Sequence, residues 1–206
     1  MAAGVLVCGG ASTRFGDEDK VCYPLAGKPL VRHVADRLEP VIDELVVNCR
    51  ASQRPALEAA LDGYARPVQY ALDEVEDAGP LHGIGRGLAE TEAEWAVVVA
   101  CDMPFVDPSF VQYLFRRATE REGAIPRYGE GDWYQPLQAV YDVPAMRRAV
   151  AATEAAGQDR PIHAVNRLDV VTLEGETLWA QTGDWTFFNV NTREDLERAR
   201  SRLRTE

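Results

Sequence analysis

The sequence predicts an α/β protein with a mostly parallel central sheet, because strand-sized and helix-sized segments alternate along the chain. The run at residues 95–101 is apolar throughout, as is typical of a strand in the middle of a parallel sheet. A length of 206 residues with 46% hydrophobic residues suits one such domain with a buried core. Sheets of this kind bind ligands beyond the carboxyl ends of their strands, so the loops after strands are the places where we expect chemistry.

In the first half of the chain, turn residues separate four apolar runs from four segments with helical spacing. The first run stops at Gly9 and Gly10, which predicts that a buried strand ends there. The segment 29–38 has apolar residues three and four positions apart, as on one face of a helix. The expected strands span residues 3–8, 44–49, 67–72 and 95–101, and the expected helices span 29–38, 53–61, 80–89 and 108–117.

The alternation is looser in the second half. Two strands are expected around a loop at residues 129–133, and a third strand and two helices follow. Thr192, with Asp195 three positions later, predicts the N-cap of the last helix. The expected strands span 123–128, 136–141 and 168–173, and the expected helices span 145–156 and 192–203. Without internal repeats or a long linker, we expect a single domain over residues 1–206.

Composition and charge exclude several classes of protein. No apolar run approaches the roughly 20 residues of a membrane span, and the amino-terminal residues lack the features of a signal peptide, so we expect a cytoplasmic protein without a membrane partner. A net charge of −11 and a sequence pI near 4.8 disfavour a nucleic-acid partner. The acidic excess fits either solubility in a high-salt cytoplasm or an ordinary acidic protein.

Four cysteines, at positions 8, 22, 49 and 101, are too widely spaced for a CxxC pair or a Cys/His metal site. Three of them stand at or near the ends of apolar runs. A small buried thiol packs well there, so we expect a structural role rather than redox or metal chemistry.

The loop after the first strand has the composition of a polyphosphate site. Gly9 and Gly10 allow the backbone to approach a ligand closely, while Arg14 and Lys20 supply a planar fork and a mobile charge. With Lys28, they make this region basic against the acidic background. The spacing fits neither a P-loop nor a dinucleotide fingerprint, and on glycine content alone a plain tight turn is an equal alternative.

A second candidate is Asp102, which follows the apolar run 95–101. A carboxylate at the tip of a buried strand faces the ligand crevice, and Mg²⁺ prefers carboxylate oxygens together with substrate phosphates. The alternative is an Asp that caps the next helix, although Asp107 and Ser109 are better placed for capping. Asn48 and Asp73 end or follow two further strands. Each is either a ligand contact in the same crevice or a turn residue that bonds its own backbone.

Six segments, together with Lys20, resemble the molybdenum cofactor guanylyltransferases, a family of nucleotidyltransferases. They are Gly-Gly-x-Ser-x-Arg-x-Gly at residues 9–16 with Lys20 and Pro-Leu-x-Gly-Lys-Pro-Leu at 24–30, Gly-Pro-Leu-x-Gly at 79–83, Cys-Asp-Met-Pro at 101–104, Gln-Pro at 135–136, and Asn-x-Asn-Thr-x-x-Asp-Leu at 189–196. Arg193 stands where the family usually has proline, and both residues suit the first position of a helix. The resemblance spans nearly the whole chain and is weakest at residues 129–180.

The resemblance implies a three-layer Rossmann-like nucleotidyltransferase fold, with a nucleotide-binding half at residues 1–110 and an acceptor-binding half at 111–206. It implies GTP and molybdopterin as substrates, Mg²⁺ as cofactor with Asp102 as its ligand, and transient contact with molybdoenzymes or other cofactor-biosynthesis proteins. Arg14, Lys20 and Asp102 are the implied catalytic residues. The implied nucleotide contacts are Val7, Cys8, Gly9, Gly10, Ser12, Arg14, Lys20, Asn48, Asp73, Gly79, Pro80, Gly83 and Asp102, and the implied acceptor contacts are Gln135, Asn189 and Asn191.

Three alternatives remain at this stage. An adenosylcobinamide-phosphate guanylyltransferase shares the first loop and the Asn-x-Asn-Thr segment, but the Cys-Asp-Met-Pro and Gln-Pro segments count against it. A molybdenum cofactor cytidylyltransferase usually carries Ala-Gly where this chain has Gly9-Gly10. The third alternative is a non-catalytic nucleotide-binding or cofactor-carrier protein on the same fold. A pure binder need not keep a metal carboxylate, so Asp102 argues against it.

Overall fold

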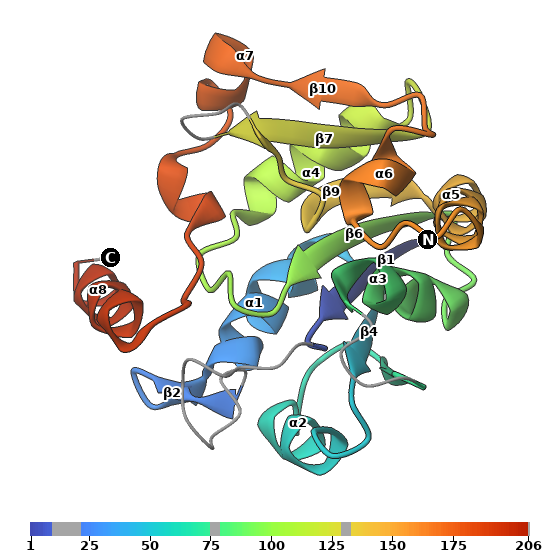
Figure 1. Cartoon of the computed structure of the whole chain (residues 1–206). Helices are drawn as coiled ribbons and strands as arrows, with labels where there is room; N and C mark the ends of the chain where they lie inside the picture. Colours follow the sequence, from blue (N-terminus) through green and yellow to red (C-terminus); the bar gives the residue numbers. More distant parts are fainter. Residues whose placement is uncertain (10–21, 75–78, 129–132, 206) are drawn as a thin grey trace.

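A computed structural model of the chain describes residues 1–9, 22–74, 79–128 and 133–205. One sheet, in the order β10-β7-β9-β6-β1-β4-β5, runs through the centre (Figure 1). Four of its strands form a parallel block, in which β1 (Ala2–Val7) lies between β6 (Trp95–Ala100) and β4 (Glu44–Cys49), and β4 pairs with β5 (Val68–Leu72). β1 and β6 are buried along nearly their whole length, as their apolar sequences predict.

The other half of the sheet contains one strand that reverses direction. β9 (Gln138–Asp142) is antiparallel to both β6 and β7 (Gly123–Tyr128), while β10 (Val171–Leu173) is parallel to β7, and β8 (Trp133–Tyr134) is antiparallel to it. The mostly parallel α/β architecture is therefore confirmed. β9 begins two residues later than the sequence predicts, after Pro136, which has no N–H to donate.

Helices cover both faces of the sheet and bury two separate cores (Figure 1). One core lies beneath α1 (Leu30–Leu38), α2 (Arg54–Ala60) and α4 (Pro108–Ala118). The other lies beneath α3 (Gly79–Ala89), α5 (Val143–Ala155) and α6 (Pro161–Val165). α5 starts earlier than the sequence predicts, because Asp142 caps it by accepting a hydrogen bond from the Ala145 N–H at 2.7 Å. The short helices α6 and α7 (Gly175–Trp179) were not predicted.

Helix α3 packs closely against the sheet because glycines face it. A Cβ atom on Gly87 would lie 2.4 Å from Val5 Cγ1, and a Cβ on Gly83 would lie 3.0 Å from Val7 Cγ1. Both valines are buried in β1 and have little room to move. Gly83, which the resemblance places beside the nucleotide, therefore also sets, together with Gly87, the distance between this helix and the strand that leads into the site.

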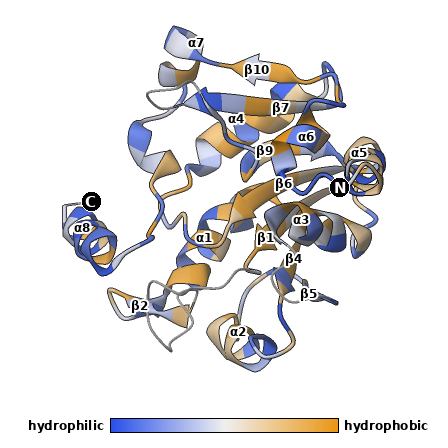
Figure 2. Ribbon diagram, in the orientation of Figure 1, coloured by the Kyte–Doolittle hydropathy of each residue, from blue (hydrophilic) through white to orange (hydrophobic). Residues whose placement is uncertain are grey.

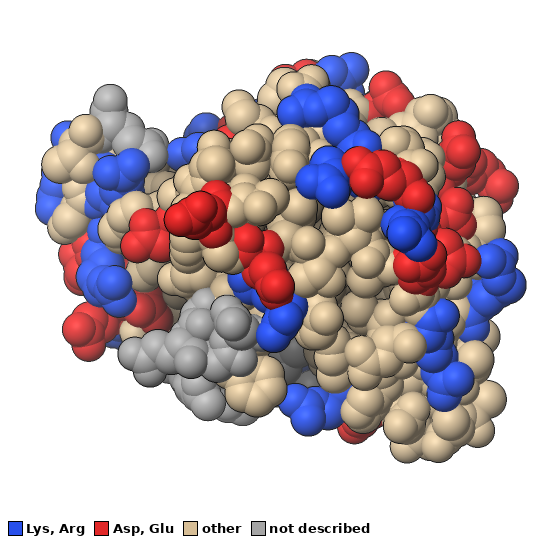
Figure 3. Space-filling view, turned by 90° about the horizontal axis from the view of Figure 1, so that it is seen from above, with Lys and Arg blue, Asp and Glu red and all other residues tan. Residues whose placement is uncertain are grey.

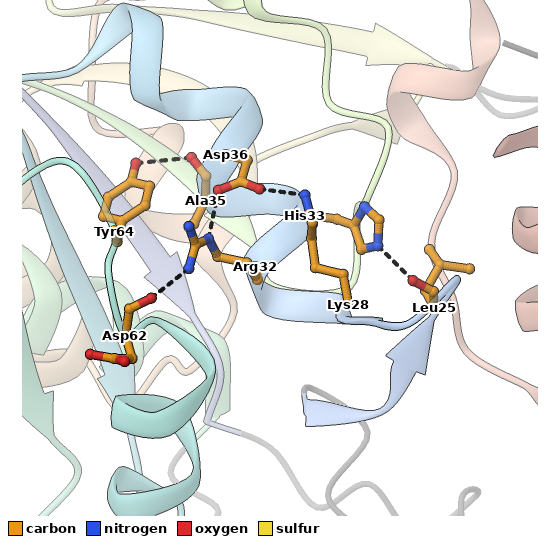
Figure 4. Close-up of polar contacts among 8 residues, drawn as sticks. All are labelled: Leu25, Lys28, Arg32, His33, Ala35, Asp36, Asp62 and Tyr64. Carbon is orange, nitrogen blue, oxygen red and sulfur yellow. Dashed lines mark hydrogen bonds and ion pairs between the residues drawn. The ribbon is translucent and has the colours of Figure 1, made fainter.

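A small hairpin of β2 (Pro24–Leu25) and β3 (Lys28–Pro29) precedes α1. Its turn residues, Ala26 and Gly27, have φ angles of 51° and 82°, as in a two-residue hairpin turn. The hairpin is tied to α1 by two side chains. Lys28 donates to Asp36 at 2.7 Å, and the His33 ring donates to the Leu25 carbonyl at 2.8 Å (Figure 4). Burial lowers the pKa of His33 from its ordinary value, which keeps the ring neutral.

The chain returns to the hairpin at its carboxyl end. After the 3-10 turn η3 (Asp184–Phe187), helix α8 (Arg193–Leu203) begins at Thr192, where the predicted capping box with Asp195 is confirmed. Arg200 on α8 donates to the Pro24 carbonyl at 3.2 Å, so the last helix lies beside the hairpin (Figure 1). Figure 2 colours β1 as hydrophobic and much of α8 as hydrophilic, in keeping with a central strand and a peripheral helix. Among the described residues, no helix is both long enough and apolar enough to span a bilayer.

The close packing of α3 yields a first prediction. Gly87→Ala should lower the free energy of unfolding by about 1–3 kcal/mol, because the added methyl group overlaps a valine that cannot withdraw. Urea unfolding followed by circular dichroism measures this change. Gly183→Ala is the control, since a Cβ at that position would meet nothing within 4 Å, and it should stay within about 0.5 kcal/mol of the unsubstituted protein. Equal stability of the two variants would contradict the packing argument.

Candidate active site

Four strands end side by side at one edge of the sheet, and a candidate residue stands at or just beyond each end. Backbone hydrogen bonds continue past the strands and hold these ends together. Cys8 N–H donates to the Asn48 carbonyl at 2.9 Å, Asp73 N–H donates to the Cys49 carbonyl at 2.9 Å, and Cys101 N–H donates to the Val7 carbonyl at 3.3 Å. Gly9, Asn48, Asp73 and Asp102 are thus brought to the same edge, as the sequence pattern predicts.

Asn48 is the centre of a buried polar cluster. Its side chain is fully buried, and Nδ2 donates to Asp73 Oδ1 at 2.6 Å and to the Ala71 carbonyl at 3.3 Å. Its Oδ1 has no hydrogen-bond partner among the described residues. A Cβ on Gly9 would lie 3.1 Å from this oxygen, and one on Gly83 would lie 2.4 Å from it. Both glycines are therefore needed to admit the Asn48 amide, whose hydrogen bonds run across to β5 instead of closing a local turn.

The cluster presents hydrogen-bond acceptors towards Gly9. A Cβ on Gly9 would lie 2.5 Å from Asp73 Oδ2, so this carboxylate oxygen lies directly against the glycine backbone. Asp73 is half-buried, whereas Asn48 has no exposed surface. A carboxylate oxygen that faces a glycine, beside the amide oxygen of Asn48, suits a ligand edge with N–H groups.

Asp102 lies in the turn after β6 and is half-buried. It does not cap the next helix. Asp107 does, by accepting hydrogen bonds from Ser109 N–H at 2.8 Å and Phe110 N–H at 3.4 Å. The alternative interpretation of Asp102 as a helix cap is therefore wrong. No group of three or more metal-ligating side chains occurs in the described part of the chain, so a cation here would depend on Asp102 together with ligand oxygens and water.

A segment from the far end of the chain lies against Asp102. Val190 N–H donates to the Asp102 carbonyl at 2.9 Å, which places Asn189 and Asn191 beside the predicted metal ligand. Both asparagines line a pocket of about 410 Å³. Tyr128, Trp185, Phe187 and Phe188 supply aromatic walls, Arg198 supplies a cation, and Asp184 and Asp195 complete the lining.

Gln135 lies at the same edge, but it does not line this pocket and does not belong to the polar cluster around Asn48. Its side chain donates to the Trp133 carbonyl at 3.2 Å and holds the turn before β9. A second hollow, of about 610 Å³, lies beside this turn and is lined by Trp133, Tyr134, Pro136, Arg160, Pro161, Ile162 and Asn166. Trp133 is 71% exposed, so a large aromatic surface is available next to the predicted acceptor residue.

The cysteines lie in or beside the core. Cys8, Cys49 and Cys101 are buried, and Cys22 is half-buried. Burial, together with a hydrogen bond to Cys101, raises the pKa of the Cys8 thiol well above its ordinary value, which keeps it protonated. The expectation of small buried thiols at the ends of apolar runs is confirmed for these three buried cysteines. The His82 ring contacts Glu154 at 3.3 Å and so points away from the polar cluster around Asn48.

Four predicted residues, Gly10, Ser12, Arg14 and Lys20, lie outside the described residues. Lys28 was counted with them as part of a basic loop, but its ammonium group pairs with Asp36 instead (Figure 4).

Gly79 has a φ of +87° and, with Pro80, begins α3 at the same edge. In the face shown in Figure 3, Lys and Arg are interspersed with Asp and Glu among the described residues.

Sequence reasoning missed Gln53 and every residue that lines the aromatic pocket except Asn189 and Asn191. Gln53 is buried and donates to the Cys8 carbonyl, and Arg198 lies in the aromatic pocket. A buried glutamine just after a strand gives no pattern in sequence, because its partner is 45 positions away. Arg198 is one of several arginines on a charged helix, so nothing in the sequence distinguishes it.

Comparison with known proteins gives consistent matches over the whole chain. Residues 4–170 match the family described as MobA-like NTP transferase domain. A probable molybdenum cofactor guanylyltransferase of Natronomonas pharaonis is 46% identical over 200 residues, covering 97% of both chains. One of Haloferax mediterranei is 38% identical over 200 residues, covering 97% of this chain and 93% of its own. The molybdopterin-guanine dinucleotide biosynthesis protein A of Archaeoglobus fulgidus superposes over all of both chains, with a TM-score of 0.79 and 27% identity.

The polar cluster predicts a difference between two adjacent acids. Asp73→Ala should lower the free energy of unfolding by about 1–2 kcal/mol, because the buried Asn48 amide loses its short bond to a carboxylate. Glu74→Ala is the matched control. It removes an exposed ion pair to Arg86, and such pairs contribute about 0–1 kcal/mol. Chemical unfolding at neutral pH compares the two, and a larger loss for the Glu74 variant would refute the role given to Asp73.

Proposed function

This chain belongs to the family of MobA-like NTP transferase domains, and we propose that it transfers the GMP moiety of GTP to molybdenum-bound molybdopterin. The products are pyrophosphate and the molybdopterin guanine dinucleotide cofactor. The observation that carries the proposal is the hydrogen bond between Val190 and Asp102, which joins the aromatic pocket to the edge that holds the Asn48 cluster. Two substrates bound on either side of Asp102 would have their reacting phosphates next to each other.

The nucleotide side is proposed to read guanine through hydrogen-bond acceptors. Guanine carries N–H groups at N1 and at its 2-amino position, and the half-buried Asp73 carboxylate, held by the buried Asn48 amide, is the acceptor that lies at the Gly9 face. Cytosine offers a single amino group along with its own acceptors, so it pairs less well with such a cluster. Val7, Cys8, Gly79 and Pro80 complete the proposed nucleotide contacts at this edge.

The acceptor side is proposed to lie in the pocket of about 410 Å³. Its aromatic walls suit a flat heterocycle, and Asn189, Asn191 and Arg198 supply polar groups for a phosphorylated ligand. Gln135 lies at the neighbouring hollow, and its proposed part is to support the acceptor from that side. These roles divide the chain into the nucleotide-binding half, residues 1–110, and the acceptor-binding half, residues 111–206.

The proposed reaction is in-line attack by the acceptor's terminal phosphate on the α-phosphorus of GTP. Such a transfer depends on positioning and charge neutralisation rather than on a protein nucleophile. Arg14 and Lys20 are proposed to neutralise the triphosphate. Asp102 would hold Mg²⁺, and the bound ion supplies positive charge to phosphate oxygens. The fit rests on a half-buried carboxylate that is not used for helix capping.

Pyrophosphate release tests this function directly. The purified protein is incubated with Mg²⁺ and GTP, CTP or ATP, with and without molybdenum-loaded molybdopterin. We expect turnover only with GTP and that acceptor, because only this pair fills both sides of Asp102. Turnover with CTP instead would contradict the guanine assignment, and GTP binding without pyrophosphate release would contradict the enzyme assignment.

A second experiment tests the part played by Asp102. Asp102→Asn should lower kcat by about 100-fold or more, because an amide neutralises no cation charge and binds Mg²⁺ poorly. The variant should unfold at the same temperature as the unsubstituted protein. Asp169→Asn is the control, since this exposed aspartate pairs with Arg121 on the surface. Full activity of the Asp102 variant would rule out its proposed role.

A further inference from the structure

Gln53 occupies an unusual position between β1 and β4, where the two strands end. It is 3% exposed, although it is a polar residue in the turn before α2. Its Oε1 accepts a hydrogen bond from Arg50 N–H at 2.9 Å, and its Nε2 donates to the Cys8 carbonyl at 3.3 Å. One side-chain amide therefore bridges the backbones of the two strands.

The bridge replaces a bond of the parallel ladder. In a regular ladder, Cys8 N–H donates to the Asn48 carbonyl, and the Cys8 carbonyl accepts from Arg50 N–H. The first of these bonds is present at 2.9 Å. In place of the second bond, the Gln53 amide lies between the Arg50 N–H and the Cys8 carbonyl. Its oxygen accepts from Arg50 N–H, and its nitrogen donates to the Cys8 carbonyl. β1 and β4 therefore stop pairing directly beyond the first bond, and through this separation Arg50 N–H and the Cys8 carbonyl each keep a partner in the Gln53 amide.

The separation occurs one residue before Gly9. Gly9 has little freedom to move, because a Cβ on it would lie 2.5 Å from Asp73 Oδ2 and 3.1 Å from Asn48 Oδ1. A shift of the Cys8 carbonyl towards β4 would carry the Gly9 backbone with it. We propose that Gln53 is a positioning residue for the nucleotide, which holds Cys8 and Gly9 at the distance from Asn48 and Asp73 that GTP requires. The inference rests on the proposed function, in which these residues contact GTP.

Two substitutions distinguish the contributions of the two Gln53 hydrogen bonds, the one with Arg50 N–H and the one with the Cys8 carbonyl. Gln53→Met keeps the size of the side chain and removes both hydrogen bonds, so that Arg50 and Cys8 can pair directly and draw the strands together. Gln53→Glu, when ionised, keeps the acceptor for Arg50 N–H and loses the donor to Cys8. When protonated, it regains a donor and resembles glutamine. Thr153→Val is the control, because Thr153 is fully buried on α5, away from β1 and β4. The substitution removes two hydrogen bonds, which the hydroxyl donates to the Ala149 carbonyl and accepts from Arg167 Nε.

Calorimetric titration with GTP and steady-state kinetics provide the readouts. We expect the Kd and KM for GTP to rise about tenfold in both Gln53 variants, with the KM for the acceptor unchanged. The Glu variant should regain GTP affinity relative to the unsubstituted protein as the pH falls, whereas the Met variant should not. Having two variants keeps the test available if one of them does not fold.

Three results would overturn the inference. The first is GTP affinity like that of the unsubstituted protein in the Met variant. The second is normal affinity in the Glu variant at all pH values, which would mean that Gln53 only closes the turn with Arg50. The third is an equal loss in the Thr153 control, which would trace the effect to general destabilisation. Failure of the unsubstituted protein to bind GTP is a separate result, which contradicts the proposed function and removes the basis of the inference.

Discussion

The buried amide of Asn48 is the contact on which the arrangement of the candidate site depends. It bonds to Asp73 and to the backbone of β5, and its oxygen lies between the positions of Gly9 and Gly83. One side chain thus fixes the end of β1, the end of β5 and the first turns of α3 relative to one another. The Nδ2 bonds tie β4 to β5, while β1 and α3 are set by close packing, because the Asn48 oxygen fits only where Gly9 and Gly83 lack a side chain.

The sequence was sufficient for the features that follow from local pattern. Apolar runs that end in Asn48, Asp73 and Asp102 predicted three strands, and the rule that parallel strands share an edge predicted that these polar residues would meet. Capping of the last helix by Thr192 also depends only on neighbouring residues, and it was predicted correctly. The approach of Asn189 and Asn191 to Asp102 was implied by resemblance alone, because the bond that creates it joins residues 102 and 190.

Other features could not be predicted because they depend on distant partners or on competition between weak signals. The insertion of Gln53 into the ladder depends on how β1 and β4 diverge, which no pattern in either strand specifies. Lys28 was expected to add positive charge to the region of the first loop, and its pairing with the Asp36 carboxylate on the following helix was not predicted. Helices α6 and α7 have only five residues each, which is too short for a periodic signal.

The bond between Val190 and Asp102 also bears on the order in which the protein forms during synthesis. The proposed nucleotide edge is built from β1, β4, β5, α3 and β6, and all of these elements have emerged once residue 102 has left the ribosome. The aromatic pocket has to wait for residues beyond 184. A nascent chain can therefore assemble the proposed nucleotide side first, as domains that fold from the amino terminus do, and the proposed acceptor side is added by the last stretch of polypeptide. Truncated chains released before that point would contain Asn48, Asp73 and Asp102 but lack most of the residues that line the aromatic pocket.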